Sequence, residues 1–98
     1  MSKTAPTLKS RAFLAEKWAK RKEKLAHIED LDKKLNVLDD YAFMFETIYS
    51  FAHSIGESEE ELAFIKRILD TNTDEIARLD KEREALAKEK ELESLLSL

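Results

Sequence analysis

The chain has no cysteine, one glycine and one proline among its 98 residues. Without cysteine it can form no disulfide, no thiolate metal site and no cysteine nucleophile. A single glycine excludes the glycine-rich loops that bind phosphates or dinucleotides, and it excludes the many tight turns of a β-sandwich or barrel. We therefore expect an all-α protein that is not an enzyme.

Long hydrophobic runs are absent as well. The longest apolar run is Tyr41–Phe45, which is far too short to cross a membrane. The first ten residues are polar and lack the apolar stretch of a signal peptide. These features predict a soluble protein without a membrane partner, located in the cytoplasm. A virus-encoded protein that acts inside a host cell would have the same features.

Charged residues make up 39% of the chain and hydrophobic residues 43%, a balance typical of long helices with narrow apolar stripes. The net charge is −4, but it is unevenly distributed. Residues 1–24 contain eight basic and two acidic residues, a net charge of +6, so the remainder carries −10. We call residues 1–24 the basic arm.

The single glycine divides the helical sequence into two nearly equal lengths. Glycine is favoured just after a helix ends, where the chain turns left-handed. The next helix has its own start signal, a capping box of Ser58 and Glu61. Two similar helices joined in this way favour an antiparallel hairpin, although a parallel pairing between chains stays open. We predict a flexible leader (1–7) and a single domain (8–98) that contains a helix over 8–54, a turn over 55–57 near Gly56 and a helix over 58–97.

Apolar residues recur in both predicted helices at alternating steps of three and four, the pattern of a coiled coil. Asn72 occupies one of these positions, which predicts a buried amide that fixes the register of the helices. The spacing also continues through Thr71–Thr73, where poor helix propensity would allow a break. The two rows are Ile28, Leu31, Leu35, Leu38, Ala42, Phe45, Tyr49 and Ala52, and Leu62, Ile65, Leu69, Asn72, Ile76 and Leu79. Successive three-residue steps at Leu25, Ile28 and Leu31 form a phase slip.

A second apolar stripe lies beside the first row, so the apolar surface is wider than a two-helix hairpin can cover. A broad exposed apolar surface marks an interface. We therefore expect the hairpin to pair with a second copy as a homodimer that forms a four-helix bundle, or to bind another protein. The expected interface residues are Tyr41, Met44, Phe45, Ile48, Phe51, Ile55, Phe64 and Ile68.

The basic arm contains a second candidate site, in which an aromatic residue lies among cations: Lys17, Trp18, Lys20, Arg21 and Lys24. This mixture suits a protein partner or a nucleic acid. Lys20 and Lys24 repel each other at a four-residue spacing unless an anion lies between them. Within a hairpin, Glu89, Glu91 and Glu93 would supply that anion, and Trp18 would pack on Leu92 or Leu95.

Metal binding has one candidate segment, residues 70–74, which matches the first ligands of an EF-hand loop. Glu75 replaces the glycine that this loop needs, and Lys81 replaces its bidentate glutamate. Neither His27 nor His53 has a glutamate three residues before it, so the pattern of di-metal bundles is missing. We expect no metal, no cofactor and no small-molecule substrate.

These patterns predict a non-enzymatic protein–protein interaction module, such as an adaptor, an assembly factor, a small chaperone or an inhibitor. The alternative is a nucleic-acid-associated protein that uses the basic helix 9–24. A third hypothesis is an acidic helical decoy that inhibits a host enzyme.

Overall fold

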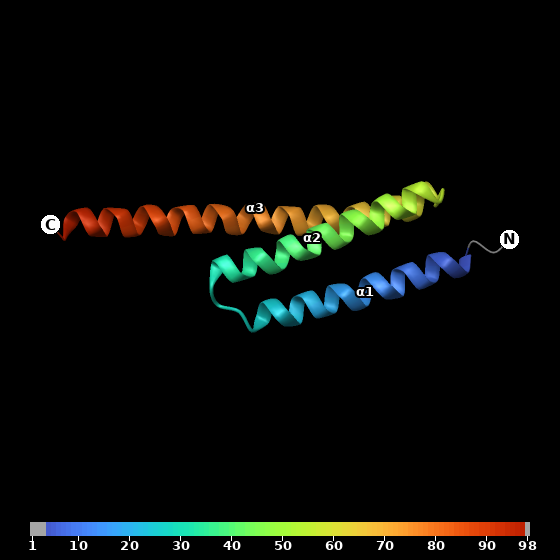
Figure 1. Cartoon of the computed structure of the whole chain (residues 1–98), viewed down its shortest axis with the longest axis horizontal. Helices are drawn as coiled ribbons and strands as arrows, with labels where there is room; N and C mark the ends of the chain where they lie inside the picture. The colour runs from blue at the N-terminus through green and yellow to red at the C-terminus, as the bar shows by residue number, and fades with distance from the viewer. Residues whose placement is uncertain (1–3, 98) are drawn as a thin grey trace.

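In the computed structural model the chain folds into three helices, α1 (Thr4–Ala26), α2 (Leu31–Ser54) and α3 (Glu59–Leu96). The structure describes residues 4–97, with side chains from Arg11 onward. α1 and α3 run in the same direction and α2 runs in the opposite direction between their ends (Figure 1). The molecule is 72 Å long because the C-terminal part of α3 extends beyond the other two helices.

The expected single helix over 8–54 is wrong, because the chain leaves the helical conformation between Ala26 and Leu31. Asp30 is extended (φ −72°, ψ 127°), and its carboxylate accepts a hydrogen bond from the Lys33 backbone N–H at 3.1 Å. This contact is an N-cap, which satisfies a backbone donor that has no partner inside α2. The break lies at the phase slip and allows α1 to fold back along α2.

The leader expected over residues 1–7 is also corrected in part. Residues 1–3 lie outside the described part of the chain, whereas residues 4–7 belong to α1. Pro6 is compatible with this start because the N–H groups of the first helical turn have no partner inside the helix. Proline therefore breaks no hydrogen bond at this position.

The turn between α2 and α3 is centred on Gly56, which has a positive φ of 77°. The Gly56 N–H donates to the carbonyl of His53 at 3.2 Å, and the Glu57 N–H donates to the carbonyl of Ala52 at 3.0 Å. These two bonds form a Schellman motif, which favours glycine. The Ser58 hydroxyl then caps α3 by accepting a hydrogen bond from the Glu61 N–H at 3.1 Å.

Gly56→Ala is expected to lower the free energy of unfolding by about 1 kcal/mol, because only the left-handed backbone opposes a side chain there. A Cβ atom at this position would meet nothing within 4 Å, so no steric overlap adds to the cost. Urea denaturation measures the loss, with Ser54→Ala as a neighbouring control that should have little effect. An alanine variant as stable as the parent would contradict a left-handed turn.

The core lies between the facing sides of the three helices. The predicted rows supply most of the buried residues: Leu35, Leu38, Phe45, Ala52, Ile65, Asn72 and Leu79. α1 adds Leu14, which is fully buried, and Trp18, whose ring centroid lies 6.0 Å from that of Phe45. The helices thus pack through the faces that the spacing predicts, with α1 as a third partner.

α3 continues through Thr71–Thr73, where the hydroxyls of Thr71 and Thr73 donate to the carbonyls of Arg67 and Leu69 at 2.8 and 3.0 Å. Beyond the bundle, residues 81–97 are all exposed; we call them the overhang. Arg83 connects the start of the overhang to the start of α2 by a 3.0 Å hydrogen bond to Asp32, and this bond raises the pKa of Arg83 above its usual value.

Candidate functional site

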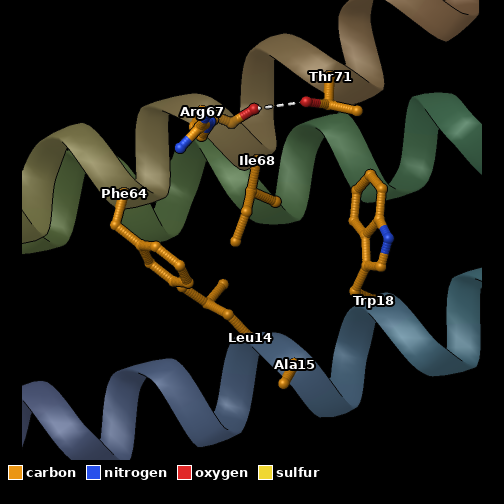
Figure 2. A pocket seen from close by; sticks show the side chains of 7 residues that line it. All are labelled: Leu14, Ala15, Trp18, Phe64, Arg67, Ile68 and Thr71. Carbon is orange, nitrogen blue, oxygen red and sulfur yellow. Dashed lines mark hydrogen bonds between the residues drawn. The ribbon is translucent and has the colours of Figure 1, made fainter.

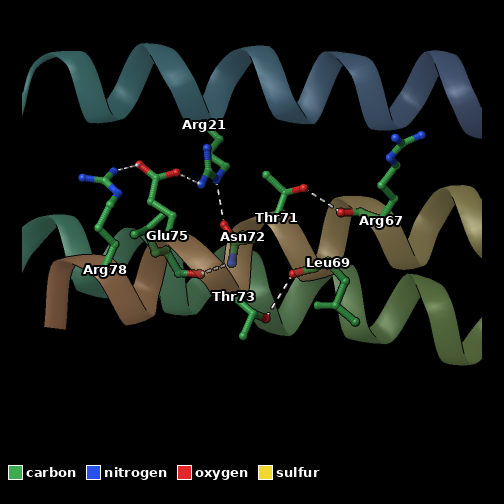
Figure 3. Close-up of polar contacts among 9 residues, drawn as sticks. Arg21, Arg67, Leu69, Thr71, Asn72, Thr73, Glu75 and Arg78 are labelled. Atoms are coloured by element: carbon green, nitrogen blue, oxygen red, sulfur yellow. Dashed lines mark hydrogen bonds and ion pairs between the residues drawn. The ribbon is translucent and has the colours of Figure 1, made fainter. Parts of the chain in front are cut away.

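The basic arm and α3 are joined by a buried polar network (Figure 3). Arg21 is 2% exposed and donates through Nε to the side-chain oxygen of Asn72 at 2.7 Å. A second guanidinium nitrogen of Arg21 bonds the carboxylate of Glu75. Asn72 is fully buried and donates its amide hydrogen to the backbone carbonyl of Leu38 at 3.0 Å. Asn72 of α3 therefore forms hydrogen bonds to both other helices, which explains why a polar residue occupies a position in the apolar row.

This network changes the interpretation of the basic partner site. Arg21 is occupied inside the protein, and its guanidinium carbon lies 4.0 Å from the ring centroid of Trp18. Lys17 and Trp18 are half-buried, and only Lys20 and Lys24 of the five predicted residues are exposed. The nitrogen of Lys24 lies 5.7 Å from the ring centroid of Tyr41. The five residues therefore do not form one accessible surface.

The expected positions of Glu89, Glu91 and Glu93 beside the basic arm are wrong, as is the contact of Trp18 with Leu92 or Leu95. Because α1 folds back at 27–30, it packs on the first half of α3 instead. Arg21 meets Glu75 there, and Arg11 meets Glu61 at 3.4 Å. An acidic partner on α3 does supply the anion for the basic arm, but from a different part of that helix.

The predicted interface residues divide into buried and accessible groups. α1 covers the region around Tyr41 and Phe45, which are 5% and 0% exposed. The surface that seemed too wide for two helices is thus partly covered by the third. Phe51 and Ile55 remain 64% and 56% exposed near the Gly56 turn. The other four are half-buried: Met44, Ile48, Phe64 and Ile68.

An apolar groove of about 380 Å³ lies between α1 and α3. Leu14, Ala15 and Trp18 line one side, and the other side is formed by Phe64, Arg67, Ile68 and Thr71 (Figure 2). The sequence placed Trp18 and the pair Phe64–Ile68 in two different candidate sites, whereas the structure brings them together. We call this feature the α1–α3 groove.

The overhang carries exposed leucines that are not among the predicted interface residues. Leu92, Leu95 and Leu96 are 56%, 61% and 78% exposed. The signal that could have identified them is their position on one side of a helix that has charged residues elsewhere. A helical segment with an apolar side and no neighbour gains stability by packing against a partner.

Glu61 is the one buried carboxylate among the described residues that has an unpartnered oxygen. Its residue is 1% exposed, and its Oε1 accepts a hydrogen bond from Arg11 Nε, while Oε2 has no hydrogen-bond partner. A capping box would also have the Glu61 carboxylate accept a hydrogen bond from the Ser58 backbone N–H. Here the carboxylate contacts Arg11 of α1 instead. Across the described residues, no three histidine, aspartate or glutamate side chains gather to hold a metal ion.

No family model matches the chain, and no similar curated protein or solved structure was found. None of the helices, over the residues described, is both long enough and apolar enough to span a membrane.

Proposed function

We propose that this protein is a non-enzymatic interaction module that binds protein chains, including its own, through the apolar helix faces that its bundle leaves open. The observation that carries the proposal is the set of large apolar side chains exposed at both ends of the molecule. Phe51 and Ile55 lie near the turn, and Leu92, Leu95 and Leu96 lie on the overhang. Apolar side chains that are grouped on a helix face are typical of protein interfaces.

An adaptor or assembly factor suits this arrangement better than a nucleic-acid-associated protein. Arg21 of the basic arm is buried and paired with Glu75. Lys20 is also partly neutralised by Glu16 at 3.8 Å. A phosphate backbone needs several accessible cations on one surface. Of the five residues in the predicted basic site, only Lys20 and Lys24 are exposed.

The experiment compares the wild type with the double variant Phe51→Glu, Leu92→Glu by sedimentation velocity over a range of concentrations. We expect the wild type to self-associate and the variant to remain a monomer, because a buried charge opposes association at either end. Both positions are exposed, so circular dichroism should show equal helix content. A wild type and a variant with identical, concentration-independent sedimentation would contradict the proposal.

A further inference from the structure

One face of α3 begins in the α1–α3 groove and ends on the overhang. Alternating steps of four and three residues connect Phe64 and Ile68 to Leu92 and Leu96, so these four residues belong to one heptad row. Such a row winds slowly around a straight helix and faces a single partner when the two helices supercoil around each other. Large apolar side chains occur only at the two ends of this face. The first pair is half-buried beside α1, whereas the second pair has no neighbouring helix among the described residues.

The sequence positions of these four apolar residues are symmetric about Asp80. Ile68 lies twelve residues before Asp80 and Leu92 twelve residues after it, while Phe64 and Leu96 are each sixteen residues away. We infer that two copies form a dimer in which their α3 helices pair antiparallel about a two-fold axis at Asp80. The overhang of each copy then occupies the α1–α3 groove of the other. This inference rests on the proposed function and names its partner as a second copy.

Charge complementarity supports the same register. Arg67 and Glu93 are each thirteen residues from Asp80, so the pairing places the arginine of one copy beside the glutamate of the other. Arg78 and Glu82, which lie 4.0 Å apart within the chain, are each two residues from the axis. Two copies of this ion pair meet there with opposite charges facing each other. Such complementarity sets the register of paired helices.

Neighbouring registers fit less well. If the axis moved by half a heptad, to lie between Glu75 and Arg78, Phe64 would face Glu89. A carboxylate would then be buried against an aromatic ring without a partner, which is unfavourable. Of these two registers, the axis at Asp80 is the one that places apolar residues on apolar residues at both ends of the face.

The bundle leaves room for this arrangement. Arg21 of α1 contacts Glu75 of α3, and α1 ends five residues later at Ala26. Because α1 and α3 run in the same direction with the same rise per residue, α1 ends close to the level of Asp80. In the dimer, each α1 helix therefore covers one half of the α3–α3 pair, and the α1 helices of the two copies cover different halves. Beside the groove, the second copy's overhang becomes a fourth helix.

Single variants and a charge swap test the inference by sedimentation equilibrium. We expect Leu92→Glu to weaken the dimer by about 100-fold or more, because each substitution acts at two symmetric places. Phe51→Glu should leave the dimer intact, because Phe51 belongs to α2 and lines neither the α1–α3 groove nor the overhang. Arg67→Glu and Glu93→Arg should each weaken association, and their combination should restore it. Dissociation by Phe51→Glu but not by Leu92→Glu would overturn the α3 pairing while keeping the proposed function.

Cysteine cross-linking tests the two-fold geometry, since the chain has no cysteine of its own. Thr71 and Glu89 are each nine residues from Asp80 and exposed, so Thr71→Cys, Glu89→Cys should oxidise to a closed covalent dimer. Within one chain these positions are about 27 Å apart, too far for a disulfide. The control Thr73→Cys, Glu89→Cys points one cysteine to another side of α3 and should not cross-link. The inference would be overturned by a ladder of larger species or by equal cross-linking of the control. A wild type that stays a monomer would overturn both the inference and self-association.

Discussion

Phe45→Ala is expected to lower the free energy of unfolding by about 3–5 kcal/mol, whereas Phe43→Ala should change it by less than about 0.5 kcal/mol. Phe45 is fully buried, and its ring centroid lies 6.0 Å from that of Trp18 and 5.9 Å from that of Tyr41. Removing it leaves a cavity where α1 meets α2. Phe43, two residues earlier on the same helix, is 74% exposed.

Urea denaturation followed by circular dichroism measures both variants. A small protein has a total stability of about 5–15 kcal/mol, so Phe45→Ala removes a large part of it. The two phenylalanines have equal helix propensity and equal side-chain area, so their difference isolates burial. Equal losses in the two variants would show that α1 does not cover Phe45, and would contradict the three-helix packing.

Arg21→Ala is expected to cost about 2–3 kcal/mol. The substitution leaves the Asn72 oxygen buried without a donor and removes the cation from Glu75, which is 28% exposed. Water reaches Glu75, so the loss is smaller than for a fully buried pair. Arg21→Lys should recover only part of the stability, because an ammonium group cannot match the planar contacts of arginine to Asn72, Glu75 and Trp18.

The control for this prediction is Lys20→Ala on the neighbouring position of α1. Lys20 pairs with Glu16 at 3.8 Å, and both side chains are more than half exposed. Such a surface pair contributes about 0.5 kcal/mol or less. Thermal unfolding of the three variants compares the two positions directly. A loss for Arg21→Ala no larger than that for Lys20→Ala would contradict the buried network.

Some elements of the fold follow directly from the sequence. The turn at Gly56 and the Ser58 cap depend on local backbone chemistry, so a single glycine and a single hydroxyl were sufficient to locate them. The burial of Asn72 followed from its place in an apolar row. In each case, the residue's own properties and a few neighbours determine the conformation.

The break between α1 and α2 depends on longer-range packing. Residues 27–30 contain no glycine or proline, and the capping aspartate resembles many other acidic residues in this charged chain. The phase slip at Leu25–Leu31 marked the place, but it is equally compatible with a continuous helix. What favours the break is the burial of Leu14 and Arg21 against the other helices, which the spacing along one helix cannot reveal.

The candidate site was predicted in pieces for the same reason. Trp18, Phe64 and Ile68 were each identified as interface residues, but their grouping in one groove depends on where α1 folds back. Tyr41 and Phe45 were assigned to an external interface because the sequence provided no third helix to cover them. Arg21 resembled a surface cation because its partners on α3 are more than fifty residues away.

The mass of the wild-type protein in solution tests the proposed self-association most directly. A monomer has a mass of 11.4 kDa, so sedimentation equilibrium should give about 23 kDa, twice that value, at concentrations above the dissociation constant. The fitted mass should fall toward that of the monomer on dilution. A mass of 11.4 kDa at every concentration, up to the millimolar range, would contradict self-association through the exposed apolar faces.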